Sequence, residues 1–191
     1  MLDASTYYGS TIALLSILLL ASWTDLQQHR IPNILSLGGI LLGIALQTWV
    51  SGIPGFAIGF TGAAVAMGIF LPFYLLKGMG AGDVKLMGAV GAFLGPHNAL
   101  LATGLSLAAG GLLGIIILIL RGGLKPLAMR YYATLKCLLL TGKLSHQPPE
   151  TGEVAATKFP YAAAIGIGTL VALWWLKILQ DMIGFFLLMI R

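Results

Sequence analysis

The sequence predicts an all-α, polytopic membrane protein: a bundle of about six transmembrane helices with a long cytoplasmic loop before the last helix. Hydrophobic residues make up 58% of the 191 residues and charged residues only 9%, and the mean hydropathy is +0.95. Such a chain has too little polar surface to cover a water-soluble globule. Most of it lies in apolar runs close to the ~20 residues that cross a bilayer. We therefore expect one membrane-embedded domain over residues 1–191.

Apolar runs bounded by Gly, Pro, Asn and charged residues give six expected helices. These extend over residues 5–24, 34–50, 53–76, 81–94, 99–120 and 159–178. The fourth is short because Asp83 and Lys85 stand at its start and Pro96 lies beyond its end, so a buried half-crossing is the alternative. The tail, 181–191, is too short to cross alone and should either extend the sixth helix or lie in the membrane interface.

Lys and Arg gather in alternate connections, as expected if every helix crosses the membrane. Of the 11 basic residues, all except Lys177 and Arg191 lie in or beside the connections after the first, third and fifth expected helices. The connections SGIPG and GPHN, after the second and fourth, contain none. Six crossings with both termini outside the cytoplasm fit best. Residues 121–158 then form the cytoplasmic loop, whose basic first half is expected to be an interfacial helix.

Several functional classes are excluded or disfavoured by composition. The single Cys excludes an internal disulfide and a Cys-rich zinc site. The three His residues share no metal-ligand spacing, so we expect no metal and no cofactor. Membrane topology explains the net charge of +5 better than nucleic-acid binding does. Small residues at four-residue spacing, such as Gly39 with Gly43 and Gly91 with Gly95, predict close helix packing and no chemistry.

Two of the six acidic residues stand at the expected cytoplasmic ends of helices: Asp25 after the first helix and Asp83 at the start of the fourth. Two crossings separate them, so both carboxylates should emerge on the same side of the membrane. An Asp beside a helix end is commonly a cap or a solvated residue, and Asp83 is well placed to cap its helix. Ionisable groups at membrane depth are also functional candidates. Position alone leaves both interpretations open.

The residues around these acids carry a resemblance to a known family. Asp25 begins DLQQHRIPN and Asp83 lies in GMGAGDVK. The two segments resemble signatures of the type IV prepilin peptidases, which are GxGD-type membrane aspartyl proteases; the matching residues are Asp25, Arg30, Ile31, Pro32 and Asn33 in the first, and Gly80, Gly82, Asp83 and Lys85 in the second. FPYAAAIGIG looks like the family's last segment. The short chain is more similar to the Tad/Flp-class and archaeal preflagellin peptidases than to the longer, methylating members.

The resemblance implies that Asp25 and Asp83 are a catalytic pair that removes the short basic leader of a prepilin or pseudopilin at the cytoplasmic membrane boundary. Peptide hydrolysis without a covalent intermediate needs a base to activate water and an acid for the leaving nitrogen, and two carboxyls that share a proton supply both. Substrate-binding or supporting roles are expected for Gly80, Gly82, Lys85, Arg30, Pro32 and Asn33.

Each supporting residue also has a plainer explanation. The glycines would serve an ordinary turn or a positive φ, Pro32 would occupy the first turn of the second helix, and Lys85 would reach to headgroups. Two other functional classes stay open. One is a small ion- or proton-coupled transporter that uses the two aspartates, although their place at helix ends disfavours it. The other is a non-catalytic pilus assembly scaffold.

Overall fold

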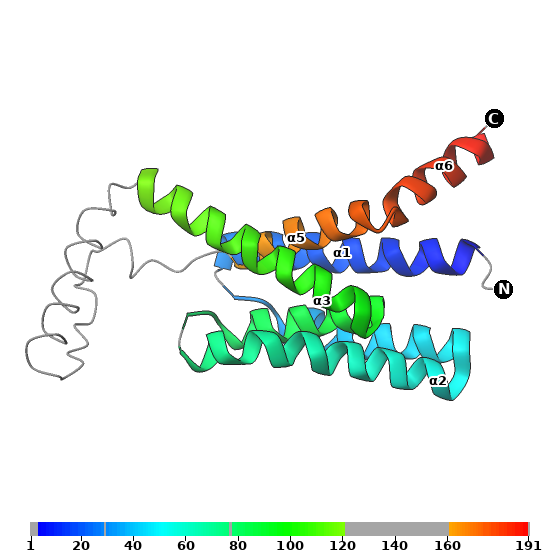
Figure 1. The fold of residues 1–191 in the computed structure, drawn as a ribbon, viewed down its shortest axis with the longest axis horizontal. Coiled ribbons are helices and arrows are strands. Elements are labelled where there is room, and N and C mark those ends of the chain that lie inside the picture. Colours follow the sequence, from blue (N-terminus) through cyan, green and yellow to red (C-terminus); the bar gives the residue numbers. More distant parts are fainter. Residues whose placement is uncertain (1–3, 29, 77, 121–160, 191) are drawn as a thin grey trace, which may run out of the picture. The chain divides into compact units, whose positions relative to one another are not determined.

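The computed structural model describes residues 4–28, 30–76, 78–120 and 161–190, and all regular structure in these ranges is helical (Figure 1). The helices are α1 (Ala4–Gln28), α2 (Asn33–Leu75), α3 (Ala81–Leu120), α5 (Tyr161–Trp175) and α6 (Ile178–Ile190). The all-α class is confirmed for this part of the chain. The predicted loop at 121–158, with its interfacial helix, lies outside the described residues.

The chain divides into two compact units. The first comprises Met1–Gly110 and Pro160–Arg191, and the second comprises Gly111–Phe159. The first unit therefore contains α1, α2, α5, α6 and most of α3. In the second unit, the described residues are those of the last turns of α3, up to Leu120. The single peptidase domain expected from the sequence stays a prediction.

Among the residues that the structure describes, three helical stretches are long and apolar enough to cross a membrane: Thr6–Gln28, Asn33–Leu75 and Ala81–Leu120. A fourth is added if α5 and α6, which meet at a bend of 71°, are counted as one span. Their length and composition indicate a membrane protein. The count of six crossings stays a prediction, as does the orientation of the termini.

Both α2 and α3 are interrupted by a glycine with a non-helical backbone. The two helices contain 43 and 40 residues, which would extend about 65 and 60 Å if straight, twice the ~30 Å of bilayer hydrocarbon. Gly52 has φ 63° and Gly95 has φ 75°, a region that L side chains rarely adopt. The interruptions fall within SGIPG and GPHN, where the sequence predicted one helix to end and the next to begin.

The two halves of α2 fold back along each other, as Figure 1 shows. A Cβ added at Gly59 would lie 3.0 Å from the Cα of Ile44, and one at Gly55 would overlap the carbonyl oxygen of Gln47. Residues with the separation of Ile44 and Gly59 would be about 22 Å apart along a straight helix. The break at Gly52 therefore turns α2 into a helical hairpin.

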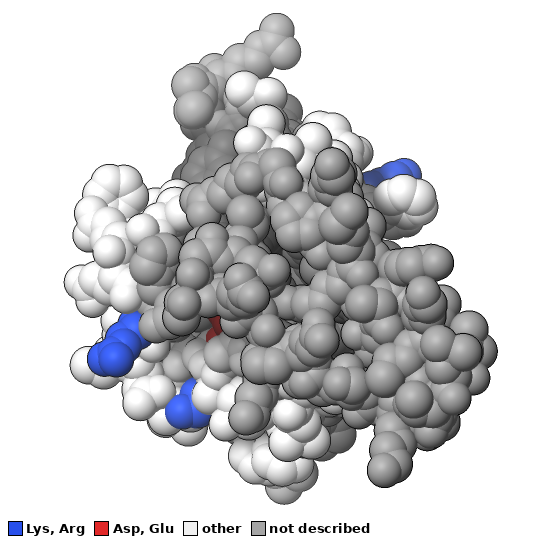
Figure 2. Space-filling model, turned by 90° about the vertical axis from the view of Figure 1, so that its left-hand side faces the viewer, with Lys and Arg blue, Asp and Glu red and all other residues white. Residues whose placement is uncertain are grey.

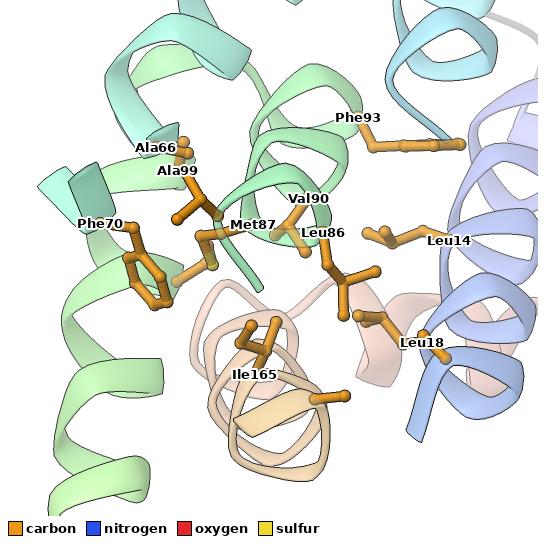
Figure 3. Packing of buried hydrophobic residues seen from close by; sticks show 14 of the residues in the cluster. Leu14, Leu18, Ala66, Phe70, Leu86, Met87, Val90, Phe93, Ala99 and Ile165 are labelled. Atoms are coloured by element: carbon orange, nitrogen blue, oxygen red, sulfur yellow. The ribbon is translucent and has the colours of Figure 1, made fainter. Parts of the chain in front are cut away.

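The hydrophobic core of the first unit is built by α1, α2, α3 and α5 (Figure 3). Its largest fully buried side chains include Leu14 from α1, Phe70 from α2, Leu86 and Met87 from α3, and Ile165 from α5. Every residue of α3 from 86 to 93 is buried. The part of the fourth expected helix that follows Asp83 and Lys85 is thus enclosed by protein on all sides.

Small residues allow the helix backbones to touch. A Cβ at Gly62 of α2 would overlap the carbonyl oxygen of Gly91 in α3, and a Cβ at Gly168 of α5 would overlap the backbone of Ser106 in α3. In a membrane, such close packing replaces the hydrophobic effect as the force between helices. The packing role predicted for the small-residue repeats is confirmed at these contacts.

The C-terminal tail does not continue α5 in a straight line. The chain bends by 71° between α5 and α6, with Lys177 at φ 62°, so the sixth expected helix ends earlier than predicted. Ile178 is buried at the start of α6, and Phe185 contacts Tyr8 of α1 with ring centroids 5.1 Å apart. These apolar contacts hold the tail against α1. An interfacial position for the tail stays a prediction.

Candidate active site

Asp25 lies in the last turn of α1 and is only 6% exposed. Its Oδ2 accepts a hydrogen bond of 3.2 Å from the backbone N–H of Ala162, the second residue of α5. The first N–H groups of a helix have no partner within the helix, and the positive end of the helix dipole favours a carboxylate there. The beginning of α5 therefore holds the Asp25 carboxyl group in place.

Asp83 is the third residue of α3 and is 7% exposed. Its Oδ2 accepts the N–H of Gly80 at 2.9 Å, while its own N–H donates to the Gly80 carbonyl oxygen at 3.2 Å. This reciprocal pair has the form of the third-residue half of a capping box. The capping role predicted as the plainer explanation is thus present. The hydrogen bond from Gly80 uses only one of the two carboxylate oxygens of Asp83, and each oxygen can accept more than one hydrogen bond. The cap therefore does not use up the capacity of the carboxyl group to bind other donors.

Asp25 and Asp83 lie close enough for their charges to interact. They come from the C-terminal end of α1 and the N-terminal end of α3, which meet at the left-hand end of the first unit in Figure 1. Figure 2 views this end, where a small acidic area is visible between residues that the structure does not describe and basic side chains lie towards the edges. The fold has brought together, and largely withdrawn from solvent, the two acids that the sequence singled out.

Tyr161, the first residue of α5, borders the same place. Its phenol lies close enough to Asp83 for an electrostatic interaction, and its half-buried ring would contact a Cβ at Gly110 at 3.7 Å. Sequence reasoning did not select Tyr161. The available signal was its position in FPYAAAIGIG, which was noted only as a segment resembling the family.

The segments that carry the two aspartates also contact each other through their neighbours. Lys85 Nζ donates a hydrogen bond of 3.0 Å to Asn33 Oδ1, at an exposed position. A Cβ added at Gly82 would lie 3.2 Å from the Cβ of Ile31, so glycine permits a close approach there. Gly80 and Gly82 do not adopt positive φ, which corrects one of the roles considered for them. Gly80 instead supplies the N–H that binds Asp83.

Pro32 and Arg30 lie in the connection between α1 and α2. Pro32, with φ −59° and ψ 136°, precedes the first helical residue, so the prediction that it occupies the first turn is wrong by one position. Its extended ψ directs its carbonyl towards the helix, where the oxygen accepts the N–H groups of Leu35 at 3.0 Å and Ser36 at 3.3 Å. Arg30 is exposed.

Comparison with known proteins decides the family. The model of the type IV leader peptidase family matches residues 12–115, more than half of the chain and the part that contains both aspartates. The chain belongs to the type IV leader peptidase family. No curated protein and no solved structure matches it. Members of this family are proteases, and the membership of this chain in the family implies a prepilin-like substrate.

The described part of this leader peptidase contains no group of three or more His, Cys, Asp or Glu residues that could hold a metal ion. A cavity of about 110 Å³ lies at the other end of the helices, lined by Tyr7, Gln47 and Asn98 among others. These residues lie near the start of α1 and near the two glycine breaks. The cavity is therefore separate from the aspartates.

Proposed function

We propose that this leader peptidase is an aspartyl endopeptidase that removes the short basic leader from prepilin-like or pseudopilin precursors at the cytoplasmic boundary of the inner membrane. Asp25 and Asp83 form its catalytic pair. The observation that carries the proposal is the meeting of two nearly buried carboxyl groups from distant helices, within interaction range of each other. Family membership supplies the reaction class.

The pair performs general acid and base catalysis without a covalent intermediate. One carboxylate takes a proton from a water molecule while the water oxygen attacks the scissile carbonyl carbon. The other carboxyl gives its proton to the carbonyl oxygen, which produces a tetrahedral diol. When the diol collapses, the C–N bond breaks, a proton passes to the leaving nitrogen, and one acid and one amine are released. The two carboxyls act as a coupled pair, so the roles belong to the pair rather than to either residue.

The surroundings of the aspartates suit this chemistry. Ala162 N–H fixes Asp25 and Gly80 N–H fixes Asp83, so neither carboxyl has to be ordered at the moment of reaction. Their burial keeps like charges in a poorly solvated site, which favours one shared proton over two ionised groups.

The supporting residues form the rim of the site in this proposal. Lys85 and Asn33 hold the beginnings of α3 and α2 together, and Gly82 lets the segment before Asp83 approach Ile31. Arg30 and Pro32 belong to the same connection and would contact the leader segment of the precursor. The substrate helix would pack against the bundle from the bilayer, with the scissile bond at the two aspartates.

Separate Asp25→Asn and Asp83→Asn variants, assayed for cleavage of a co-expressed prepilin, test the proposal. An amide can neither take up nor supply the proton, so each variant should lose at least about a hundredfold in rate. Asp181→Asn, which neutralises an exposed carboxylate in α6, is the matched control and should cleave normally. Full cleavage by either active-site variant would remove the mechanism. If instead the variants cleave normally but no longer take up protons into vesicles that contain the protein, the proton-coupled transporter is favoured.

A further inference from the structure

Ala162, the second residue of α5, is bound to α1 through both of its backbone polar groups. Its N–H donates to Asp25 Oδ2 at 3.2 Å, and its carbonyl oxygen accepts the Ser22 hydroxyl at 3.2 Å. We propose that Ser22 is a positioning residue for the catalytic pair: by holding the Ala162 carbonyl, it keeps the Ala162 N–H on the Asp25 carboxyl. This inference rests on the function proposed above.

The two hydrogen bonds come from one face of α1. Ser22 and Asp25 are three positions apart, so they are neighbours on the helix surface, and Ala162 between them is fully buried. A Cβ at Gly166 would lie 3.4 Å from Ser22 Oγ, which places the hydroxyl against the first turn of α5. One hydrogen bond would let this turn pivot on Asp25, whereas two at opposite ends of one residue fix it.

The Ser22 hydroxyl differs from its neighbours on α1 in what it binds. The hydroxyls of Ser10, Ser16 and Thr24 each donate to the carbonyl oxygen four residues earlier in α1, the usual bond of such side chains inside a helix. Ser22 instead donates to a residue 140 positions away. A helical carbonyl oxygen can accept this hydroxyl in addition to its bond within the helix. Ser22 thus joins α1 to α5 where the others serve α1 alone.

The hydrogen bond from Ala162 to Asp25 is sensitive to small movements of α5. Its length of 3.2 Å lies at the long end of the usual range of about 2.7–3.2 Å, so even a slight retreat of α5 would weaken it. Asp25 is only 6% exposed, so water has little access to replace a lost donor. Holding α5 in place therefore holds one oxygen of the Asp25 carboxyl and limits rotation of the group.

Ser22→Ala removes the hydroxyl and leaves both catalytic carboxyls in place. With the purified full-length protein and a prepilin-like peptide, a short basic leader ahead of an apolar helix, we expect kcat to fall about threefold to tenfold, the effect of losing one neutral hydrogen bond. KM should change by less than about twofold. The acid limb of the kcat–pH profile should move to higher pH, because a weaker N–H bond stabilises the ionised carboxyl less. A loss of folded enzyme would instead scale the rate equally at every pH.

Two other serines supply matched controls. Ser16→Ala removes a hydroxyl that bonds within α1 and should match the wild type. Ser106→Ala removes a bond of the same kind as that of Ser22, from α3 to the Ile165 carbonyl oxygen of α5 at 3.4 Å, and should lower stability without moving the pH profile. An equal loss of kcat and an equal pH shift in either control would overturn the inference, because the effect would then not depend on Ala162.

The Asp25→Asn and Asp83→Asn variants belong in the same series. If they retain cleavage, the proposed function fails whatever the result for Ser22→Ala. If they are inactive while Ser22→Ala has the wild-type kcat and pH profile, only the inference on Ser22 is overturned. A lower kcat or melting temperature of Ser22→Ala with an unchanged pH profile would likewise overturn it, because the serine would then be purely structural.

Discussion

The contact between Gly62 and Gly91 permits a sharp test of the packing. An alanine at position 62 would place its Cβ onto the Gly91 carbonyl oxygen. Since heavy atoms in contact lie about 3.5–4.0 Å apart, α2 and α3 would have to separate by about 1 Å. Overpacking typically costs 1–3 kcal/mol, and this site belongs at the upper end because backbone meets backbone. The better helix propensity of alanine offsets about 1 kcal/mol. We therefore expect Gly62→Ala to reduce the free energy of unfolding by about 2 kcal/mol.

Gly68→Ala is the matched control on the same helix. A Cβ there would meet nothing within 4 Å, so only the propensity gain remains and stability should rise by up to about 1 kcal/mol. Reversible unfolding in mixed detergent micelles, followed by the fluorescence of the four Trp residues, measures both variants. Equal stability of Gly62→Ala and Gly68→Ala would refute the close approach of α2 and α3.

Three further changes test other contacts. Gln47 Nε2 donates a hydrogen bond of 2.8 Å to the carbonyl oxygen of Phe93, just before the break in α3. Gln47→Leu leaves this oxygen without its partner and should cost about 1–3 kcal/mol of stability; unchanged stability would contradict this. Lys85 and Asn33 should show a coupling of about 1 kcal/mol or less in a double-mutant cycle, because their bond is exposed. Gly82→Ala should lower kcat with little loss of stability, because the added Cβ displaces the segment before Asp83 only slightly; a wild-type kcat would refute that.

Much of the fold could be predicted because its signals are local. Apolar runs give the helices, and the glycines and prolines of SGIPG and GPHN mark the interruptions at Gly52 and Gly95. The tail illustrates the limit of this reasoning. Nothing in its apolar run indicates the bend at Lys177, which depends on contacts such as that of Phe185 with Tyr8.

The candidate site was predictable for a different reason. An even number of expected crossings between Asp25 and Asp83 requires the two acids to lie on one side, and the structure brings them into interaction. The partners that hold the carboxyls were less accessible. The hydrogen bond from Ala162 N–H to Asp25 joins two segments far apart along the chain, one near the end of α1 and one at the start of α5. The hydrophobic periodicity of the sequence does not predict such a long-range contact. Tyr161 was missed for the same reason.

Cross-linking is the most direct test of the convergence of the two acids. In a Cys137→Ser background, which removes the single native Cys, the pair Asp25→Cys and Asp83→Cys should react rapidly and intramolecularly with a short bifunctional thiol reagent in native membranes. The control pair is Asp25→Cys with His97→Cys. Because His97 lies just after the break in α3 at Gly95, at the opposite end of the helical segment that Asp83 begins, this pair should not cross-link. Failure of the first pair to cross-link, with both thiols shown to be reactive, would contradict a shared catalytic site.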